Sequence, residues 1–382
     1  REALRQYQLP IVLWLTPPIA GHLAQLAPDF WSWRGGVFEF SQPIAWTLPE
    51  RPERQEMRGR GFTSDESTAN PEDLEQQIAD LKAQDAESPL LASLYMELGA
   101  AYKATVQYAE AASAYEQALQ LRETQLGSEH ADTATSLNEL ALLYQSMGRY
   151  GEAESLYARS LAIYEAQLGP DHPSTATSLN NLAGLYRSMG RYGETEPLYA
   201  RSLEISEAQL GPDHPATATS LNNLAGLYRS MGRYGEAEPL YARSLAIYEA
   251  QLGPDHPATA TSLNNLALLY ESMGRYSEAE TLQKRDLAIN EVQLGPEHPD
   301  TATSLNNLAE LYRSMGRYGE AEPLHIRALA ILEKSLPPEH PYISTGKANF
   351  RYLLQAVIEA NQTDQLSEHP LTQALLQELQ SS

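Results

Sequence analysis

The sequence predicts an all-α protein, a solenoid of stacked helix pairs that follows a small α/β segment. Two observations predict the solenoid. The first is a period of 42 residues that governs the middle of the chain. The second is the spacing of apolar residues within each period, which is that of two successive helices without any strand. Repetition of this length is typical of proteins in which each unit packs only against its neighbours.

Two recurring strings define the period. Leu-Gly-Pro-Asp-His-Pro, or a degenerate copy of it, recurs every 42 residues from Leu126 to Leu336. Ser-Met-Gly-Arg-Tyr recurs every 42 residues from Ser146 to Ser314, with a decayed copy at 105–108. The strings divide residues 90–341 into six 42-residue units, which are numbered 1 to 6 below.

Unit 3 shows how one period builds two helices. Its first helix has an apolar stripe at i, i+3, i+4, i+7 and i+10, formed by Leu179, Leu182, Ala183, Tyr186 and Met189. Gly190 ends that helix, and Gly211-Pro212 ends the second one, because glycine accepts the left-handed conformation of a helix stop. Pro197 is expected in the opening turn of the second helix, where a missing N–H costs least. Tyr192 is expected to pack between the two helices.

The segments outside the repeats have different patterns. Residues 1–47 combine a short apolar run with an aromatic-rich stretch, and we interpret them as the remnant of an N-terminal α/β domain. Residues 48–89 are predicted to be an acidic linker and a capping helix. Residues 342–382 are predicted to form C-terminal capping helices, because a terminal unit would otherwise expose its apolar face. Since the chain opens with Arg1 rather than Met, we expect it to be a fragment of a longer protein.

The repeat resembles the kinesin-light-chain subclass of tetratricopeptide repeats. The resemblance is carried by Leu-Asn-Asn-Leu-Ala-x-Leu-Tyr, Met-Gly-Arg-Tyr-x-Glu-Ala-Glu and Leu-Gly-Pro-Asp-His-Pro, and by the 42-residue period. It implies a right-handed superhelix whose first helices line a concave groove that takes extended peptides. It implies no motor partner, because such repeats also occur in bacterial multidomain proteins. Residues 1–47 are similar to the end of the ATPase-like domains that precede such repeats in some bacterial signalling proteins.

Composition and motifs exclude several classes of function. The net charge of −23 argues against nucleic acid as a partner, and no apolar run is long enough to span a membrane. With no cysteine, thiolate metal sites and disulfides are excluded, and a cytoplasmic location is expected. No phosphate-binding Gly-x-x-x-x-Gly-Lys-Ser/Thr string occurs, and no catalytic constellation stands outside the periodic positions. We therefore predict no enzymatic activity, no cofactor and no metal.

The candidate binding residues form a polar ridge on the first helices, opposite the apolar stripe. An Asn amide both donates and accepts hydrogen bonds, so it can pair with a peptide backbone of any sequence, and Arg favours carboxylates. The predicted peptide-binding residues are Asn138, Asn180, Asn181, Arg187, Asn222, Asn223, Arg229, Asn264, Asn265, Asn306, Asn307 and Arg313. In unit 5, Glu271 replaces the arginine, so the charge preference should change along the groove.

Two alternatives concern these repeated polar residues. The asparagines could instead bond to adjacent helices and act as scaffolding between units. The histidine of each unit, such as His172, has no second metal ligand at suitable spacing, and we predict that it caps the next helix, with Pro173 at the first position.

The predicted function is that of a protein-interaction scaffold which binds extended peptides or disordered segments of a partner protein in the groove. The alternative function is that of a sensor or self-association arm of a larger signalling ATPase. Near-identical units make self-association possible in geometric terms, because one surface recurs along the chain.

Overall fold

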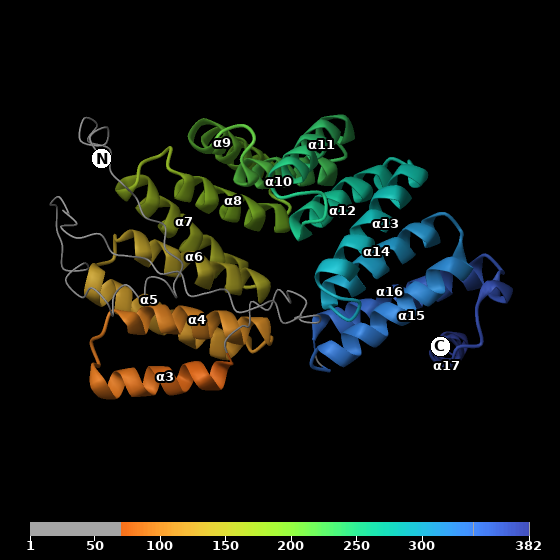
Figure 1. Ribbon diagram of the computed structural model, residues 1–382, viewed down its shortest axis with the longest axis horizontal. Coiled ribbons are helices and arrows are strands. Elements are labelled where there is room, and N and C mark those ends of the chain that lie inside the picture. Colours follow the sequence, from red (N-terminus) through yellow and green to blue (C-terminus); the bar gives the residue numbers. More distant parts are fainter. Residues whose placement is uncertain (1–69, 339, 382) are drawn as a thin grey trace, which may run out of the picture. The chain divides into compact units, whose positions relative to one another are not determined.

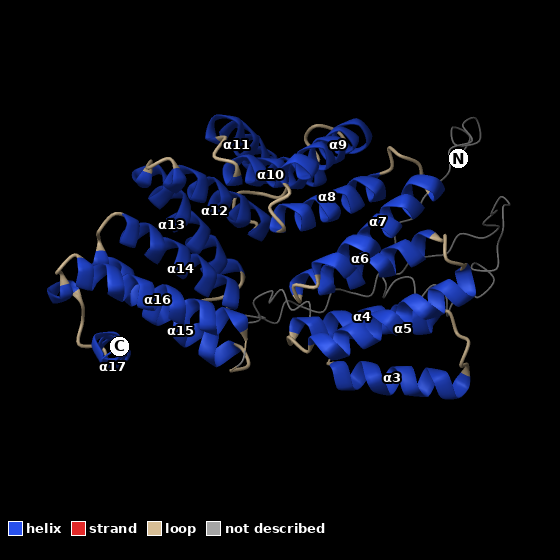
Figure 2. Ribbon diagram, turned by 180° about the vertical axis from the view of Figure 1, so that it is seen from behind, coloured by secondary structure: helices blue, strands red, loops and turns tan. Residues whose placement is uncertain are grey.

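The computed structural model describes residues 70–338 and 340–381. In these ranges the chain consists of α-helices, one 3₁₀ turn and connecting loops, without a strand, as Figure 2 shows. The α/β remnant predicted for residues 1–47 and the linker up to residue 69 lie outside the described residues.

The helices follow one another as antiparallel pairs in chain order (Figure 1). The first helices of units 1 to 6 are α4 (Leu90–Ala104), α6 (Ala131–Ser146), α8 (Pro173–Ser188), α10 (Pro215–Ser230), α12 (Pro257–Ser272) and α14 (Pro299–Ser314). Their second helices are α5 (Tyr108–Leu126), α7 (Tyr150–Gln167), α9 (Tyr192–Leu210), α11 (Tyr234–Gln251), α13 (Tyr276–Gln293) and α15 (Tyr318–Ser335). Before them lies α3 (Pro71–Gln84), and after them lie α16 (Pro341–Glu359), the 3₁₀ turn η2 (Thr363–Gln365) and α17 (Pro370–Ser381).

Each helix contacts its partner in the unit and the nearest helices of the neighbouring units. The first helices of successive units also contact one another. For example, α10 contacts both α8 and α12. This consecutive packing of helix pairs is that of a tetratricopeptide-type solenoid, and it confirms the predicted α-solenoid.

The helix boundaries follow the predicted cap chemistry. His172 is the N-cap of α8, where its Nδ1 accepts a hydrogen bond from the Ser174 N–H at 3.1 Å, and Pro173 takes the first helical position. The capping role predicted for the repeated histidine is therefore confirmed. Gly190, with φ of 73°, provides the left-handed stop after α8, which the missing Cβ allows at no steric cost.

One expectation for the second helix was wrong. Pro197 lies inside α9 rather than in its opening turn, because the helix already begins at Tyr192. Tyr192 packs, half-buried, against the cluster that contains Ala183 of α8, and Tyr199, two turns further along α9, is only 2% exposed. Tyr199 is therefore the most deeply buried tyrosine of the unit.

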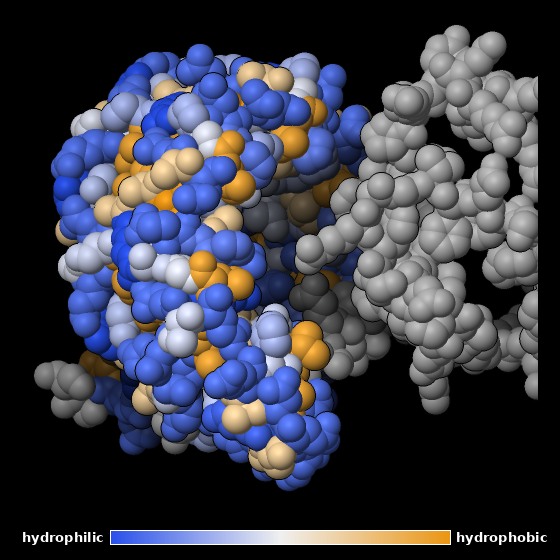
Figure 3. Space-filling model, turned by 90° about the vertical axis from the view of Figure 1, so that its left-hand side faces the viewer, coloured by the Kyte–Doolittle hydropathy of each residue, from blue (hydrophilic) through white to orange (hydrophobic). Residues whose placement is uncertain are grey.

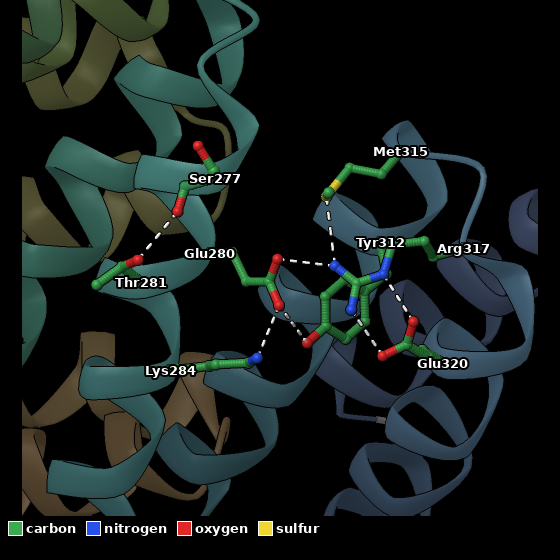
Figure 4. A network of polar contacts seen from close by, with 8 residues as sticks. All are labelled: Ser277, Glu280, Thr281, Lys284, Tyr312, Met315, Arg317 and Glu320. Atoms are coloured by element: carbon green, nitrogen blue, oxygen red, sulfur yellow. Dashed lines mark hydrogen bonds and ion pairs between the residues drawn. The ribbon is translucent and has the colours of Figure 1, made fainter.

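A polar clasp joins successive units from unit 2 to unit 6, and Figure 4 shows the one between units 5 and 6. Glu280 of α13 accepts hydrogen bonds from the Tyr312 hydroxyl at 3.1 Å and from Arg317 Nη1 at 2.7 Å. The guanidinium of Arg317 lies 4.1 Å from the centroid of the Tyr312 ring and also bonds to Glu320. Desolvation alone would raise the pKa of Glu280, but hydrogen bonds from Lys284, Arg317 and Tyr312 lower it to about 2.

The same clasp recurs along the array, through Glu154 with Tyr186 and Arg191, and through Glu196 with Tyr228 and Arg233. The arginine of each clasp is the one in the repeated Ser-Met-Gly-Arg-Tyr string. The structure shows what it does: it fixes the register of neighbouring units through a carboxylate and an aromatic ring.

Unit 1 departs from the repeat at its helix stop. Val106 replaces the glycine found at 148, 190, 232, 274 and 316, yet it has the same left-handed conformation, with φ of 62°. A β-branched residue is strained there, at a cost of about 1–2 kcal/mol. We therefore expect Val106→Gly to raise the free energy of unfolding by about 1 kcal/mol, net of the chain entropy that glycine adds to the unfolded state. Urea titration would measure this, and an unchanged or lower stability would show that the strain is relieved elsewhere.

Candidate functional site

The polar ridge of the first helices is where the predicted binding residues lie. The face seen in Figure 3 is mostly hydrophilic, with hydrophobic residues scattered rather than gathered into one patch. Along the ridge, each first helix presents two adjacent asparagines in units 3 to 6, and the two differ in what they contact.

In units 3, 5 and 6 the first asparagine of the pair bonds to another side chain of the solenoid, whereas the side chain of Asn222 in unit 4 forms no hydrogen bond with the described part of the chain. Asn180 Nδ2 donates to Ser220 Oγ of the next unit at 3.2 Å. Asn306 Oδ1 lies 3.0 Å from His325 Nδ1, and Asn264 Oδ1 accepts from Asn307 Nδ2 at 2.9 Å. Asn138 is 7% exposed, and its Oδ1, like those of Asn180 and Asn222, is buried without a hydrogen-bond partner.

In units 3, 4 and 5 the side chain of the second asparagine of the pair makes no hydrogen bond within the described solenoid. Asn181, Asn223 and Asn265 are half-buried at the surface, and their side chains form no hydrogen bond with the described part of the chain. In unit 6 the second asparagine, Asn307, is the donor to Asn264. The ridge therefore keeps three amides whose donors and acceptors face outward.

The predicted arginines also fall into two groups. Arg187 reaches the next unit, where its Nη1 lies 2.7 Å from the position that a Cβ on Gly226 would occupy, so the glycine makes room for it. Among the described residues, neither Arg187 nor Arg229 has a carboxylate within ion-pair distance. Arg313, in contrast, pairs with Glu310 at 2.8 Å and lies over the Tyr352 ring, 4.4 Å from its centroid.

Glu271, which replaces the arginine in unit 5, is bonded to the next unit. Ser314 Oγ donates to its Oε1 at 2.9 Å. Burial, followed by the charge of Glu310, raises the pKa of Glu271 against the opposing effect of Arg313 and Arg229. The sign of the charge along the ridge thus changes from two unpaired cations in units 3 and 4 to a half-buried carboxylate in unit 5.

Two cavities open between successive first helices. One, of ≈ 400 Å³, is lined by α8, α9 and α10, with Asn181, Asn223 and Ser206 among its residues. The other, of ≈ 230 Å³, is lined by α12, α13 and α14, with Asp286 and Asn290 at its inner side.

A single position of the second helix decides where these cavities open. Ser206 and Asn290 occupy it in the two open units. In units 2 and 4 the position is a tyrosine, whose hydroxyl reaches the unit's own first helix, as Tyr248 does to Thr219 Oγ1 at 2.8 Å. The large ring takes the space that the smaller side chains leave free.

The sequence-based prediction did not include Asp286, Asn290 or Ser206. The signal that could have found them is departure from the repeat: Asp286 stands where Ser160, Ser202 and Ser244 stand in units 2, 3 and 4.

Within the described part, no three His, Asp or Glu side chains are grouped as a metal site would require. No helix of that part is long and apolar enough to cross a membrane.

Comparison with known proteins identifies the repeat. A family model described as tetratricopeptide repeat matches residues 90–166, 136–194, 174–250 and 221–291, and a second one matches 301–342. Together these ranges cover more than half of the chain. Among curated proteins none matches the chain.

Several solved structures are similar. BtubC (BKLC) from P. vanneervenii is 27% identical, with a TM-score of 0.49 over 61% of this chain and 93% of that one. The nearly identical TPR-like repeats of a kinesin-light-chain candidate from Podosopora anserina are 32% identical, with a TM-score of 0.46 over 54% and 98%. The APC/C hetero-tetramer Cut9-Hcn1 shares the fold at 15% identity, with a TM-score of 0.51 over 76% and 47%. The chain belongs to the tetratricopeptide-repeat family, with repeats of the kinesin-light-chain type.

Proposed function

We propose that this chain is a protein-interaction scaffold whose ridge of first helices binds an extended peptide or a disordered segment of a partner protein. Proteins built from tetratricopeptide repeats generally bind other proteins, and the finer assignment rests on the ridge itself. The observation that carries it is the division of the asparagine pairs. In units 3 and 5 the first member bonds within the solenoid, whereas Asn181, Asn223 and Asn265 keep free donors and acceptors at a 42-residue spacing.

The geometry suits a peptide backbone. An amide side chain can accept from a peptide N–H and donate to a peptide C=O, so successive units can bind successive stretches of an extended chain. Each bond contributes about 0.5–1.5 kcal/mol net, so affinity has to be distributed over several units and over side-chain contacts. Arg187 and Arg229, as unpaired cations on the ridge, would favour acidic side chains on the segment that lies over units 3 and 4.

The test is capture of peptides from a displayed random dodecapeptide library by the purified chain and by the triple variant Asn181→Ala, Asn223→Ala, Asn265→Ala. We expect the variant to lose capture and to keep its helical circular dichroism, because these side chains make no bond within the solenoid. Capture at the wild-type level by the folded variant would overturn the role of the ridge.

The chain offers a matched control. Gln209, Gln251 and Gln293 are exposed amides on the second helices of the same three units. Their replacement by Ala removes the same chemistry from another face and should leave capture unchanged. If the wild-type chain captures no peptide and associates only with itself in sedimentation velocity, the alternative of a self-association arm is favoured instead.

A further inference from the structure

We propose that the cavity between α12, α13 and α14 is a specificity pocket for one basic side chain, a lysine or arginine, of the bound segment. This inference rests on the proposed function and adds to it: it names the residue chemistry that unit 5 selects and the order of charges along the segment.

The pocket exists because unit 5 lacks the tyrosine that fills the equivalent space in unit 4. Asn290 replaces the tyrosine, and its Nδ2 donates to Ser304 Oγ at 2.8 Å and to Asp286 Oδ1 at 3.2 Å. The amide is thereby held against the wall of the cavity. What remains is a space of ≈ 230 Å³ whose rim is formed by Thr261, Asn264, Thr303 and Asn307.

The size of the pocket limits its occupant. Sites for whole small-molecule ligands usually measure about 300–1,000 Å³, so this cavity suits a single side chain better than a free metabolite. It lies on the same ridge as the outward-facing amide of Asn265, so a peptide backbone bound there can place a side chain into it.

The charge of the pocket is negative and is not neutralised by the protein. Asp286 is 3% exposed and lines the cavity, and no cationic side chain of the described chain pairs with it. The other titratable group acting on it is Asp300 of α14, which lines the same cavity and is also acidic. The other polar residues that line the cavity from α12 and α14 are neutral hydroxyls and amides.

The buried carboxylate of Asp286 destabilises the protein when no ligand is bound. Burial, and then the charge of Asp300, raise the pKa of Asp286 to about 6, although hydrogen bonding to Ser304 and Asn290 opposes the shift. A buried charge without a partner destabilises a fold, and an ammonium or guanidinium in the cavity would supply that partner. Units 2, 3 and 4 carry a neutral serine at the same position, so the fold does not need the carboxylate.

The charges of the ridge also predict the order of charges along the segment. Unpaired Arg187 and Arg229 lie in units 3 and 4, and the acidic pocket lies at the junction of units 5 and 6. The segment that fits has acidic residues over units 3 and 4 and one basic residue over unit 5.

The first test uses single blocked amino acids, because these probes can bind in the pocket without a longer peptide backbone. Nα-acetyl-lysine methylamide and Nα-acetyl-arginine methylamide are titrated against the full chain, with Nα-acetyl-norleucine methylamide as the uncharged probe. Binding is followed by the NMR shifts of the Asn264 and Asn290 side-chain amides. We expect the two cationic probes to bind and the norleucine probe not to bind. We expect Asp286→Ser to weaken the cationic probes by about tenfold or more, because it removes the ion pair.

The unit 4 side chains supply a folded control. The double variant Asp286→Ser, Asn290→Tyr recreates the Ser244 and Tyr248 arrangement in unit 5 and should abolish probe binding while the helical signal persists. Ser206→Tyr fills the other cavity and should leave the cationic probes unaffected. Equal binding of the norleucine probe, or cationic binding unchanged by Asp286→Ser, overturns the pocket assignment.

The dodecapeptide library separates this inference from the proposed function. Peptides captured by the wild-type chain should be enriched in one Lys or Arg, and the enrichment should disappear in Asp286→Ser while capture itself continues. Capture without that enrichment overturns the pocket and leaves the scaffold. Probe binding without any peptide capture overturns the scaffold, and with it the assignment of a peptide side chain to the pocket.

Discussion

Replacing Asp286 by Ser is expected to stabilise the protein, by about 3 kcal/mol near neutral pH. The carboxylate is buried, and its pKa is raised from 3.8 to about 6. A shift of about two units corresponds to about 3 kcal/mol between the charged and neutral forms. The serines at the equivalent positions donate to a backbone carbonyl at 2.8 Å, as Ser244 does to Ala218. Serine at 286 could form the same bond to Ala260, for about 0.5–1.5 kcal/mol more.

The pH dependence of this effect has a definite sign. Because the pKa of Asp286 is higher in the folded state, the folded protein binds more protons than the unfolded chain between about pH 4 and pH 6, and the wild type loses stability as pH rises through that window. The difference between Asp286→Ser and wild type should therefore be small near pH 4, grow up to about pH 6 and stay constant above it. Urea titrations of both proteins across this range measure the difference.

Ser202→Ala is the matched control for this experiment. It removes the hydrogen bond from Ser202 Oγ to the Ala176 carbonyl, 2.8 Å long, without changing any charge. Its cost should be about 1 kcal/mol and independent of pH. A difference between Asp286→Ser and wild type that does not vary with pH would contradict the picture of a buried carboxylate without a cation.

Replacing Glu322 by Ala is expected to release the C-terminal cap. Glu322 occupies the clasp position of unit 6, but no seventh unit follows it. Its carboxylate, 2% exposed, accepts instead from the Ser367 N–H at 2.7 Å and from the hydroxyls of Ser367 and Thr372, both at 2.6 Å. Hydrogen bonds to a charged acceptor contribute about 1.5–3 kcal/mol each, so losing three of them should exceed the local stability of a twelve-residue helix.

Hydrogen exchange measures this release. Exchange of the α17 amides should rise by about a hundredfold or more in Glu322→Ala, since each tenfold corresponds to about 1.4 kcal/mol. Leu375 and Leu376, which are buried against the last units, would become exposed, so the variant should also self-associate in sedimentation velocity. Glu320→Ala, which removes a half-exposed carboxylate bonded to Arg317 one turn away, should leave α17 protected. Unchanged α17 exchange in Glu322→Ala would show that apolar packing alone holds the cap.

The polar ridge shows which part of the candidate site could be predicted from the sequence. Helical spacing placed Asn180 and Asn181 on one polar face, since both lie opposite the apolar stripe. It could not say which of them serves the solenoid, because that depends on Ser220 of the next unit, 40 residues away. The structure separates the two roles that the sequence left as alternatives, although whether the outward amides bind a peptide remains a prediction.

The sequence by itself determined the period, the helix pairs, their caps and the family, because each of these depends on residues within one unit. The left-handed glycine stops and the histidine N-caps are local chemistry, and local chemistry repeats when the sequence repeats. Tertiary structure alone decided the clasp of Glu280 with Tyr312 and Arg317, the burial of Asp286, and the cavities that open where a serine or asparagine replaces a tyrosine. These features arise between units, where the environment of a side chain is set by its neighbours in space rather than along the chain.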